Sequence, residues 1–323
     1  MTFDVFGMCN ALVDLQAKVE DELIDALGLQ KGGMFLIDEE QRRRLMQYLA
    51  GQVVHSEAGG SGANTMIGVA LLGGSACYTS KVADDEHGAI YRRSLSEKGV
   101  KPNLAVGEGS TGVSFILLTP DAQRTMCTYL GASQQLRPDE VNIDDLRQSR
   151  YLYITGYMWD TESQKQSVLH AMSEANRAGV RVAFSLSDTF CVRRHRADFQ
   201  RLLEQHVDVL IGNEAEVQEL SGADNPYDAS RLLADYCDIA VVTMDSRGAL
   251  IRQKQTVYHI PAFRVQAVDA TGAGDMFAAG LLYGLCHGQS LEASGRIAAY
   301  CAAQVVAKMG ARLDSITLPA NVL

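Results

Sequence analysis

The chain has 323 residues, 47% of them hydrophobic, which is enough to bury a large core in one main domain with a small appendage. Its formal net charge of −10 argues against non-specific binding to nucleic acid or to acidic membranes, because both need a basic surface. Seven cysteines without a CxxC pair indicate neither a zinc site nor a disulfide framework, and no signal-peptide pattern or apolar run of transmembrane length is evident. We therefore expect a cytoplasmic protein.

The first 130 residues mix extended and helical patterns. Strands are expected at residues 3–8, 12–19, 32–37 and 77–82, and helices at residues 21–27, 39–50, 65–72 and 87–98. Residues 112–130 contain two strand-like runs around Pro120 and Asp121, which predicts a β-hairpin.

From residue 151 onward, strands and helices alternate regularly, which predicts a parallel sheet with right-handed crossovers. The expected strands are residues 151–155, 181–186, 207–211, 240–243, 249–252 and 256–260, and the expected helices are residues 161–177, 197–205, 214–220, 274–286 and 291–308. Two segments rich in extended pattern, 11–37 and 106–133, are predicted to form a small lid over a large α/β domain made of residues 1–10, 38–105 and 134–323.

The run DATGAGD, residues 269–275, stands directly before an apolar segment with helical spacing. Amides at a helix start lack intrahelical partners and carry partial positive charge, so we expect Gly272, Ala273 and Gly274 to bind an anion. Beside this anion hole, Asp275 suits a general base that deprotonates a hydroxyl group while the amides stabilise a transferring phosphoryl group. The alternative interpretation is that Asp275 only caps the helix.

Other glycine patterns bear on ligand binding. The chain has no Walker-type GxxxxGK[ST] motif, which disfavours a P-loop nucleotidase. Gly107, Gly109 and Gly112 satisfy GxGxxG, but the pattern precedes a strand-like run instead of opening a helix, so we interpret it as a hinge. The run GGSGAN, residues 59–64, leads into a helix, where glycines allow either close approach to a polyhydroxyl ligand or close helix packing.

Two of these runs carry a family resemblance. AGGSGANTMIGVALLGG and DATGAGDMFAAG resemble the paired motifs of the PfkB or ribokinase family of carbohydrate and nucleoside kinases. NEAEV is similar to the family's NxxE element, and TMDSRG to its TxGxxG phosphate loop, so the resemblance covers essentially the whole chain. It implies a ribokinase-like three-layer α/β/α fold with a mostly parallel central sheet and a small β-sheet lid.

The resemblance also implies roles on the phosphate side of the site. Asp275 corresponds to the general base and Gly272 to Gly274 to the anion hole. Asn213 and Glu216 correspond to the element that orders Mg²⁺ and its waters, and the oxygens of Asp269 and Thr271 to a site for a monovalent cation such as K⁺. The residues expected to bind ATP are Asn213, Thr243, Gly248, Gly272, Gly274 and Ala303.

On the acceptor side, GMCNALVD resembles the adenosine kinase branch, in which the acid at Asp14 holds two ribose hydroxyls. Arg124 resembles an arginine of that branch that moves from the lid to the transferring phosphate, a task that suits a planar and permanently charged guanidinium. The apolar members of the expected set either cover a purine ring or form the packed underside of the lid. The full set of expected acceptor-binding residues is Asn10, Leu12, Asp14, Met34, Leu36, Gly60, Ser61, Asn64 and Leu130.

Three places depart from the family pattern. Asp245 stands where the family commonly has Gly, which brings the backbone approach to ATP into question. Met34 occupies a lid position where a polar side chain would read the base, so the sequence leaves the base undefined. Residues 184–188 replace the usual DPN run near the nucleotide phosphates.

Together these features predict a kinase that uses ATP and Mg²⁺ to phosphorylate the 5′-hydroxyl of a purine nucleoside, with adenosine as the first candidate. The alternative within the family is a sugar kinase of the ribokinase or fructokinase type. An oxidoreductase is disfavoured by the context of the GxGxxG pattern, and a catalytically silent sugar-binding or regulatory protein by the intact DATGAGD and NEAE runs. We expect a small-molecule substrate, no nucleic-acid or membrane partner, and a monomer or a homodimer.

Overall fold

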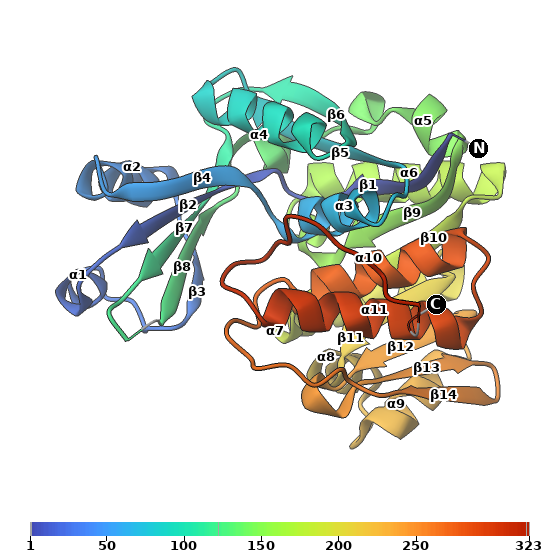
Figure 1. Cartoon of the computed structure of the whole chain (residues 1–323). Helices are drawn as coiled ribbons and strands as arrows, with labels where there is room; N and C mark the ends of the chain where they lie inside the picture. The colour runs from blue at the N-terminus through green and yellow to red at the C-terminus, as the bar shows by residue number, and fades with distance from the viewer. Residues whose placement is uncertain (1, 122, 321, 323) are drawn as a thin grey trace.

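The computed structural model describes residues 2–121, 123–320 and 322. The described residues form two β-sheets of unequal size, and the smaller sheet makes a separate lobe at one end of the molecule (Figure 1). Met1, Ala122, Asn321 and Leu323, which belong to ranges predicted above, lie outside the described residues.

The larger sheet provides the frame of the molecule. Among the described residues its strands are β1 (Phe3–Met8), β5 (Ala76–Ala83), β6 (Val100–Gly107), β9 (Ser149–Thr155), β10 (Arg181–Ser185), β11 (Val209–Asn213), β12 (Ile239–Thr243), β13 (Ala249–Gln253) and β14 (Thr256–Ile260). Their order across the sheet is β14-β13-β12-β11-β10-β9-β1-β5-β6. The strands from β12 to β6 pair in parallel, whereas β12, β13 and β14 are joined as antiparallel hairpins. The mostly parallel central sheet is therefore confirmed.

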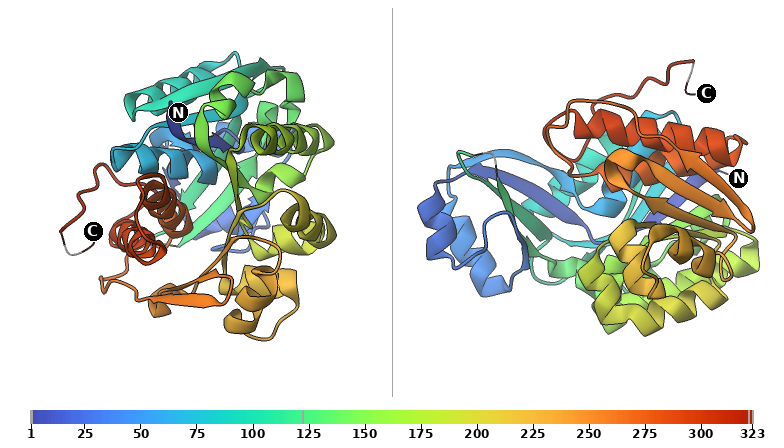
Figure 2. Two further views of the ribbon diagram at one scale, coloured as in Figure 1. Left: turned by 90° about the vertical axis from the view of Figure 1, so that its right-hand side faces the viewer. Right: turned by 90° about the horizontal axis from the view of Figure 1, so that it is seen from below.

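Successive side chains of the parallel strands enter two different cores. Val5 and Ala183 belong to one hydrophobic cluster, and their neighbours Phe6 and Phe184 to another. Because side chains alternate across a strand, both faces of this sheet are apolar and both need helices to cover them. Helices α3 (Ser61–Leu71), α4 (Glu86–Glu97), α10 (Ala273–Cys286) and α11 (Leu291–Val306) cover the first face, and α5 (Ile143–Arg147), α6 (Glu162–Ala178), α7 (Thr189–Gln205), α8 (Glu214–Ser221) and α9 (Pro226–Leu233) cover the second. Figure 2 shows these helices on opposite sides of the sheet.

The smaller sheet has one packed face and one open face. Its strands are β2 (Leu12–Lys18), β3 (Met34–Leu36), β4 (Val53–Gly59), β7 (Gly112–Leu118) and β8 (Arg124–Tyr129), in the order β3-β8-β7-β2-β4. Val13, Phe115 and Cys127 lie on the packed face with Ile24 of α1 (Asp21–Ala26) and Leu45 of α2 (Glu39–Tyr48). The predicted hairpin of β7 and β8 is confirmed.

The boundary between the two lobes differs from the predicted one. Strand β4 pairs with β2 in the smaller sheet, although residues 38–105 were assigned to the large domain. Most of β4 is exposed and it stands at the sheet edge, so VVHSEAG lacks the apolar alternation that marks a strand. Residues 106 and 107 belong to β6 of the larger sheet rather than to the lid.

Two strands, two α-helices and the start of α7 were not predicted. Strands β4 and β6 and helices α5 and α9 were absent from the expected set, and α7 begins at Thr189 rather than near residue 197 because two helical segments meet at a kink at His195, where φ is −119°. The GxGxxG pattern runs from the end of β6 to the start of β7, so no helix follows it and the context of a dinucleotide site is absent.

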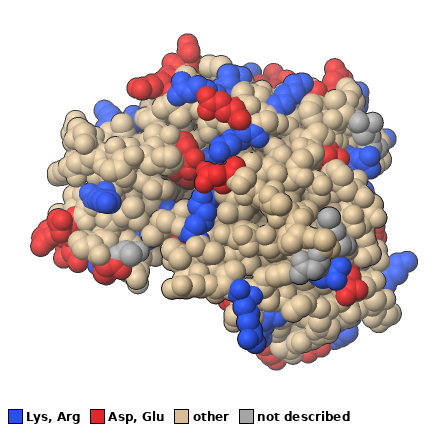
Figure 3. All heavy atoms as spheres, viewed as in Figure 1, with Lys and Arg blue, Asp and Glu red and all other residues tan. Residues whose placement is uncertain are grey.

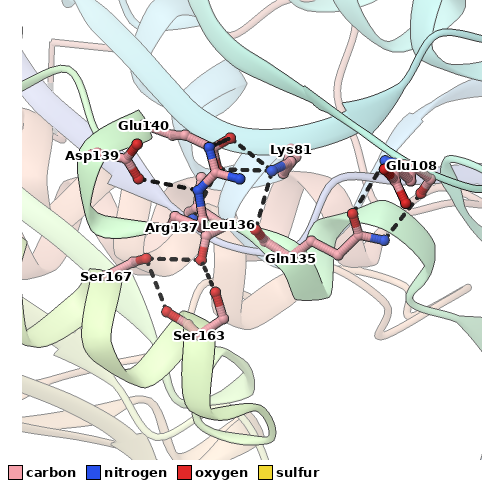
Figure 4. Close-up of polar contacts among 9 residues, drawn as sticks. All are labelled: Lys81, Glu108, Gln135, Leu136, Arg137, Asp139, Glu140, Ser163 and Ser167. Atoms are coloured by element: carbon pink, nitrogen blue, oxygen red, sulfur yellow. Dashed lines mark hydrogen bonds and ion pairs between the residues drawn. The ribbon is translucent and has the colours of Figure 1, made fainter.

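A buried lysine fixes the irregular segment that follows the smaller sheet. Lys81 of β5 is 3% exposed, and its Nζ donates hydrogen bonds to the Glu140 carboxylate at 2.7 and 2.9 Å and to the Gln135 carbonyl at 3.2 Å (Figure 4). These contacts anchor two short 3-10 helices, Gly131–Gln135 and Pro138–Glu140, to the larger sheet.

Acidic and basic side chains are interspersed over the face shown in Figure 3, without a large area of one sign. No helix in the described part of the chain is both long and apolar enough to cross a membrane.

Candidate active site

A cavity of about 2080 Å³ is lined by the open face of the smaller sheet and by residues at the carboxyl ends of parallel strands. Ser185, Asn213 and Thr243 end β10, β11 and β12 and line it, as expected for ligand sites in parallel α/β sheets. Asp269 is the one predicted site residue that does not line the cavity. Those that do are Asn10, Leu12, Asp14, Met34, Leu36, Gly60, Ser61, Asn64, Arg124, Leu130, Asn213, Glu216, Thr243, Gly248, Thr271, Gly272, Ala273, Gly274, Asp275 and Ala303.

Asp275 lies in the first turn of α10 with both carboxylate oxygens engaged. Its Oδ1 accepts a hydrogen bond from Ser61 Oγ at 2.5 Å, and its Oδ2 accepts one from Asn64 Nδ2 at 2.8 Å. Burial raises the pKa of Asp275, while these two hydrogen bonds and the charge of Arg312 oppose the rise. A carboxylate in a fixed orientation with a raised pKa has the properties of a general base.

At the start of α10, two of the three amides predicted to form an anion hole lack an acceptor among the described residues. The Ala273 N–H donates to the Ala270 carbonyl at 3.2 Å, whereas the amides of Gly272 and Gly274 have no acceptor among the described residues. Gly272 has φ of +78°, and a Cβ there would lie 2.3 Å from the Ala311 carbonyl oxygen, so only glycine fits. A Cβ on Gly274 would meet nothing within 4 Å, and Gly274 lines the cavity.

Asp14 projects from β2 onto the end of β4. A Cβ on Gly59 would lie 2.0 Å from Asp14 Oδ1, so the Asp14 side chain fills the place left by that missing side chain. Glu57 faces Asp14 across the β2–β4 pair and also lines the cavity. Burial raises the pKa of Asp14 to about 6, the positive charge of Arg312 lowers it and the negative charge of Glu57 raises it.

Asn10 lines the cavity, but its amide is held by the protein. Oδ1 accepts hydrogen bonds from Gln164 Nε2 at 2.6 Å and from Ser133 Oγ at 3.0 Å, and Nδ2 donates to the Tyr157 carbonyl at 3.3 Å. Ser133 belongs to the segment that Lys81 anchors, so the network of Figure 4 supports the loop after β1.

The apolar residues of the lid lie on its open face. Leu12, Met34, Leu36 and Leu130 line the cavity, and Met34 and Leu36 are 48% and 53% exposed. The packed underside of the lid is formed by other residues. The four apolar residues therefore face the space where a ligand would lie, and they do not form the packed underside.

Arg124 links the lid to the DATGAGD loop. It is the first residue of β8, and its Nη1 donates to the Asp269 carboxylate and, at 3.3 Å, to Thr271 Oγ1. Asp269 also accepts from the Thr271 N–H at 2.9 Å and from the Gly310 N–H at 2.8 Å. Burial would raise the pKa of Asp269, but these hydrogen bonds and the charge of Arg124 outweigh it and hold that pKa below its ordinary value.

The NEAE run forms a helix cap next to the cavity. Asn213 Oδ1 accepts from the Glu216 N–H at 2.9 Å, and the Glu216 carboxylate accepts from the Asn213 N–H and Nδ2 at 2.9 and 2.7 Å. Burial raises the pKa of Glu216 to about 7, and the negative charge of Asp188 adds to the rise. Two mutually repelling carboxylates on one cavity wall fit a Mg²⁺ ion that keeps most of its waters.

The TMDSRG turn explains the departure at Asp245. Asp245 has φ of +48°, in the left-handed region that favours glycine, so the aspartate keeps the backbone conformation that the family's glycine would adopt. Gly248 has no such latitude, because a Cβ there would lie 1.9 Å from the Ile260 carbonyl oxygen. Ala303, on α11, is 8% exposed and lines the same end of the cavity as Val306.

Sequence reasoning missed two charged residues at the acceptor wall, the part of the cavity lined by Asp14, Ser61, Asn64 and Asp275; Glu57 also lines it, and Arg312 lies behind it. Glu57 lies in the strand that was not predicted, and Arg312 lies in the coil after α11, where no motif marks it. Arg312 Nε donates to Asn64 Oδ1 at 2.6 Å, and its Nη1 lies 3.5 Å from Glu57 Oε2.

Fold and site together define an α/β phosphotransferase that acts on a hydroxyl group: a partly buried aspartate stands beside a glycine-rich helix start, in a cavity between a parallel sheet and a small β lobe. The chain belongs to the pfkB family of carbohydrate kinases, which it matches over residues 33–318. Kinases of this family act on small molecules and use ATP and a divalent metal ion.

Solved structures and sequence relatives include both sugar and nucleoside kinases. The chain is 36% identical to a probable sugar kinase from Rhizobium etli CFN 42, with a TM-score of 0.89 over 97% of this chain and 96% of that one. It is also 36% identical to the adenosine kinase from Sinorhizobium meliloti, with a TM-score of 0.88 over 97% of both chains. Fructokinase-1 of Zea mays is 28% identical over 281 residues, which are 82% of this chain and 87% of that protein.

Proposed function

We propose that this protein transfers the γ-phosphoryl group of ATP to the 5′-hydroxyl of a purine nucleoside, with adenosine as the first candidate. The observation that carries the proposal is that the Asp14 carboxylate and the apolar side chains of Leu12, Met34 and Leu36 line one cavity from the same small sheet. A carboxylate suits vicinal ribose hydroxyls, and an apolar face suits the flat surface of a base.

Asp275 acts as the base in this proposal. The acceptor hydroxyl takes the position of Ser61 Oγ at Asp275 Oδ1 and gives its proton to the carboxylate as its oxygen attacks phosphorus. Asn64 keeps Oδ2 in place during this exchange. Asp275 holds the proton while the bond between the γ-phosphorus and the bridging oxygen of ATP breaks, and ADP leaves with that oxygen.

The phosphoryl group is stabilised from three directions. The free amides of Gly272 and Gly274 meet its negative charge at the start of α10. Arg124 lies on β8 of the lid, and it reaches the phosphate when its guanidinium leaves Asp269. Glu216 and Asp188 would hold Mg²⁺ through its waters, and the ion would neutralise phosphate charge.

A monovalent cation at Asp269 and Thr271 belongs to the same proposal. Asp269 already accepts hydrogen bonds from Thr271, Gly310 and Arg124, so an ion such as K⁺ gains access to its oxygens only when Arg124 has moved away. We therefore expect potassium to act on the form of the enzyme in which Arg124 has left Asp269.

The test is ADP release with adenosine, inosine, guanosine, ribose and fructose, each with ATP and Mg²⁺ and with or without K⁺. We expect kcat/KM for at least one purine nucleoside to exceed that for both free sugars by more than tenfold. A free sugar turning over better than every nucleoside would contradict the proposal.

That outcome would instead support a sugar kinase, the second candidate. It is favoured by the probable sugar kinase and the fructokinase among the relatives. The two candidates share Asp275 and differ in the use of the lid, because a sugar leaves Met34 and Leu36 uncovered.

A further inference from the structure

The coil that follows α11 returns across the DATGAGD loop. In Figure 1 this dark red segment loops towards β4 and α3. The Gly310 N–H donates to Asp269 Oδ2 at 2.8 Å, and the Ala311 carbonyl lies where a side chain on Gly272 would be. The next residue, Arg312, reaches Asn64 on α3, which is 248 positions away in the chain.

Arg312 is buried among charged and polar groups of the acceptor wall. It is 7% exposed, and its Nε donates to Asn64 Oδ1 at 2.6 Å. Its Nη1 and Nη2 are buried and have no hydrogen-bond acceptor among the described residues, although Glu57 Oε2 lies 3.5 Å from Nη1. Burial of a guanidinium destabilises the fold unless hydrogen bonds or opposite charges around it offset the loss of its hydration.

The chemistry of the two side chains fixes which way the Asn64 amide faces. A guanidinium can only donate, so Asn64 must turn its oxygen towards Arg312. Its Nδ2 then points at Asp275 Oδ2, to which it donates at 2.8 Å. With the amide reversed, Asn64 would present an oxygen to the Asp275 carboxylate and an N–H to Arg312, and both contacts would be lost.

The charge of Arg312 acts on the same carboxylates. It lowers the pKa of both Asp14 and Asp275 against the effect of burial. Other ionisable groups also face these acids. Around Asp14 they are Glu57, Arg124 and Asp275, and around Asp275 they are Asp14, Cys9, Tyr153 and Tyr157.

We propose that Arg312 is a positioning residue of the reaction: through Asn64 it orients the Asp275 carboxylate, and through its charge it keeps that carboxylate ionised. This inference rests on the proposed role of Asp275 as the base. It extends the active site to the C-terminal coil, so the site is complete only when residues 310–312 lie across the loop.

The test compares Arg312→Gln with the wild type and with a matched control. Arg252→Gln is the control, because Arg252 is also buried, at 9% exposed, and donates from Nε to Ser230 Oγ at 3.1 Å, but Ser230 does not line the cavity, whereas Asn64, the partner of Arg312, does. The measurement is the pH profile of kcat and KM between pH 5.5 and 9, with whichever acceptor the wild-type enzyme turns over best.

Removal of the positive charge raises the pKa of Asp275, and a base works only when ionised, so the rate should fall first at low pH. We expect the acid limb of the kcat profile to move to higher pH in Arg312→Gln, so that the loss of kcat relative to the wild type is larger at pH 6 than at pH 8.5. Arg252→Gln should keep the wild-type profile. An unaltered profile in Arg312→Gln would overturn the proposal.

Two further variants separate orientation from charge. Arg312→Lys keeps the charge but lacks the Nε donor, so its kcat should fall while its acid limb stays near that of the wild type. In an Asn64→Ala background, Arg312→Lys should lower kcat less than twofold further, because orientation through Asn64 is already lost. If Arg312→Gln fails to fold, the lysine variant decides, and a wild-type kcat in it would refute the orienting role.

Failure of the proposed function looks different. If no nucleoside serves as acceptor but a sugar does, the Arg312 comparison is made with that sugar and keeps its meaning. If Asp275 is not the base, Asp275→Asn will be active, and this result removes the basis of the Arg312 proposal as well.

Discussion

The two walls of the cavity are built differently. On the acceptor wall, side chains hold one another: Ser61 and Asn64 bind Asp275, and Arg312 binds Asn64. On the nucleotide wall, the part of the cavity that the proposal assigns to ATP, Gly248 and Gly272 shape the surface, and the lining residues Phe190 and Val265 are 61% and 39% exposed. The difference suggests that acceptor recognition depends on individual side chains, whereas nucleotide recognition depends on backbone shape.

The strongest challenge to this contrast is Asp275→Asn. Because an amide cannot accept the proton of the acceptor hydroxyl, we expect kcat to fall by about 10³-fold or more while the affinity for ATP stays within threefold. Steady-state ADP release and ATP titration measure the two effects. Asp235→Asn, at an exposed position outside the cavity, is the control and should behave as the wild type. Near-normal kcat in Asp275→Asn would assign the base elsewhere.

Asp14→Asn tests the proposed contact between the Asp14 carboxylate and the ribose hydroxyls of the acceptor. An amide offers one accepting oxygen instead of two, so we expect KM for a ribonucleoside to rise about 10- to 100-fold, with a smaller effect on kcat. The same measurement with the 2′-deoxy nucleoside sharpens the result. Loss of the 2′-hydroxyl should weaken the wild type strongly and the variant little, and equal losses in both proteins would remove Asp14 from that contact.

On the nucleotide wall, Glu216 is similar to the acids of the acceptor wall, because it is buried and its pKa is raised to about 7. A carboxyl with a raised pKa in the folded state binds its proton more tightly there, so stability is greatest below its unfolded pKa and is lost as pH rises towards 7. This loss is on the order of 3 kcal/mol. In thermal unfolding without ATP, the fall in Tm from pH 5 to pH 8 should be smaller for Glu216→Gln than for the wild type. Equal falls would show that Glu216 does not titrate in this window.

Asp245→Gly should have the smallest effect. Glycine adopts φ of +48° without strain, so we expect a gain of about 0.5 to 1 kcal/mol, seen in a chain of 323 residues as a rise in Tm of about 1 °C. KM for ATP should stay within threefold, because the backbone conformation is already that of a glycine. A large change in KM would mean that the Asp245 side chain itself contacts the nucleotide.

The sequence contained enough information for the fold and for a set of site residues that, except for Asp269, all line the cavity. The alternation after residue 151 follows from two-sided burial of parallel strands, and DATGAGD carries its own signal at the start of α10. Both are local patterns with a direct physical meaning.

The missed parts depend on contacts that no local pattern encodes. Strand β4 is an exposed edge strand, so its residues lack the apolar period of a core strand. Arg312 acquires its role only when a coil packs back on α3. Asp245 looked like a departure because residue type alone does not reveal that an aspartate has taken a left-handed conformation.

The hydrogen bond between Ser61 Oγ and Asp275 Oδ1 has a consequence for the cell's supply of ATP. Without an acceptor, a hydroxyl that belongs to the protein occupies the base, and a water molecule must displace it before it can attack the nucleotide. We therefore expect slow uncoupled ATP hydrolysis. Loss of this hydroxyl should raise the rate at which the enzyme hydrolyses ATP when the acceptor concentration is low.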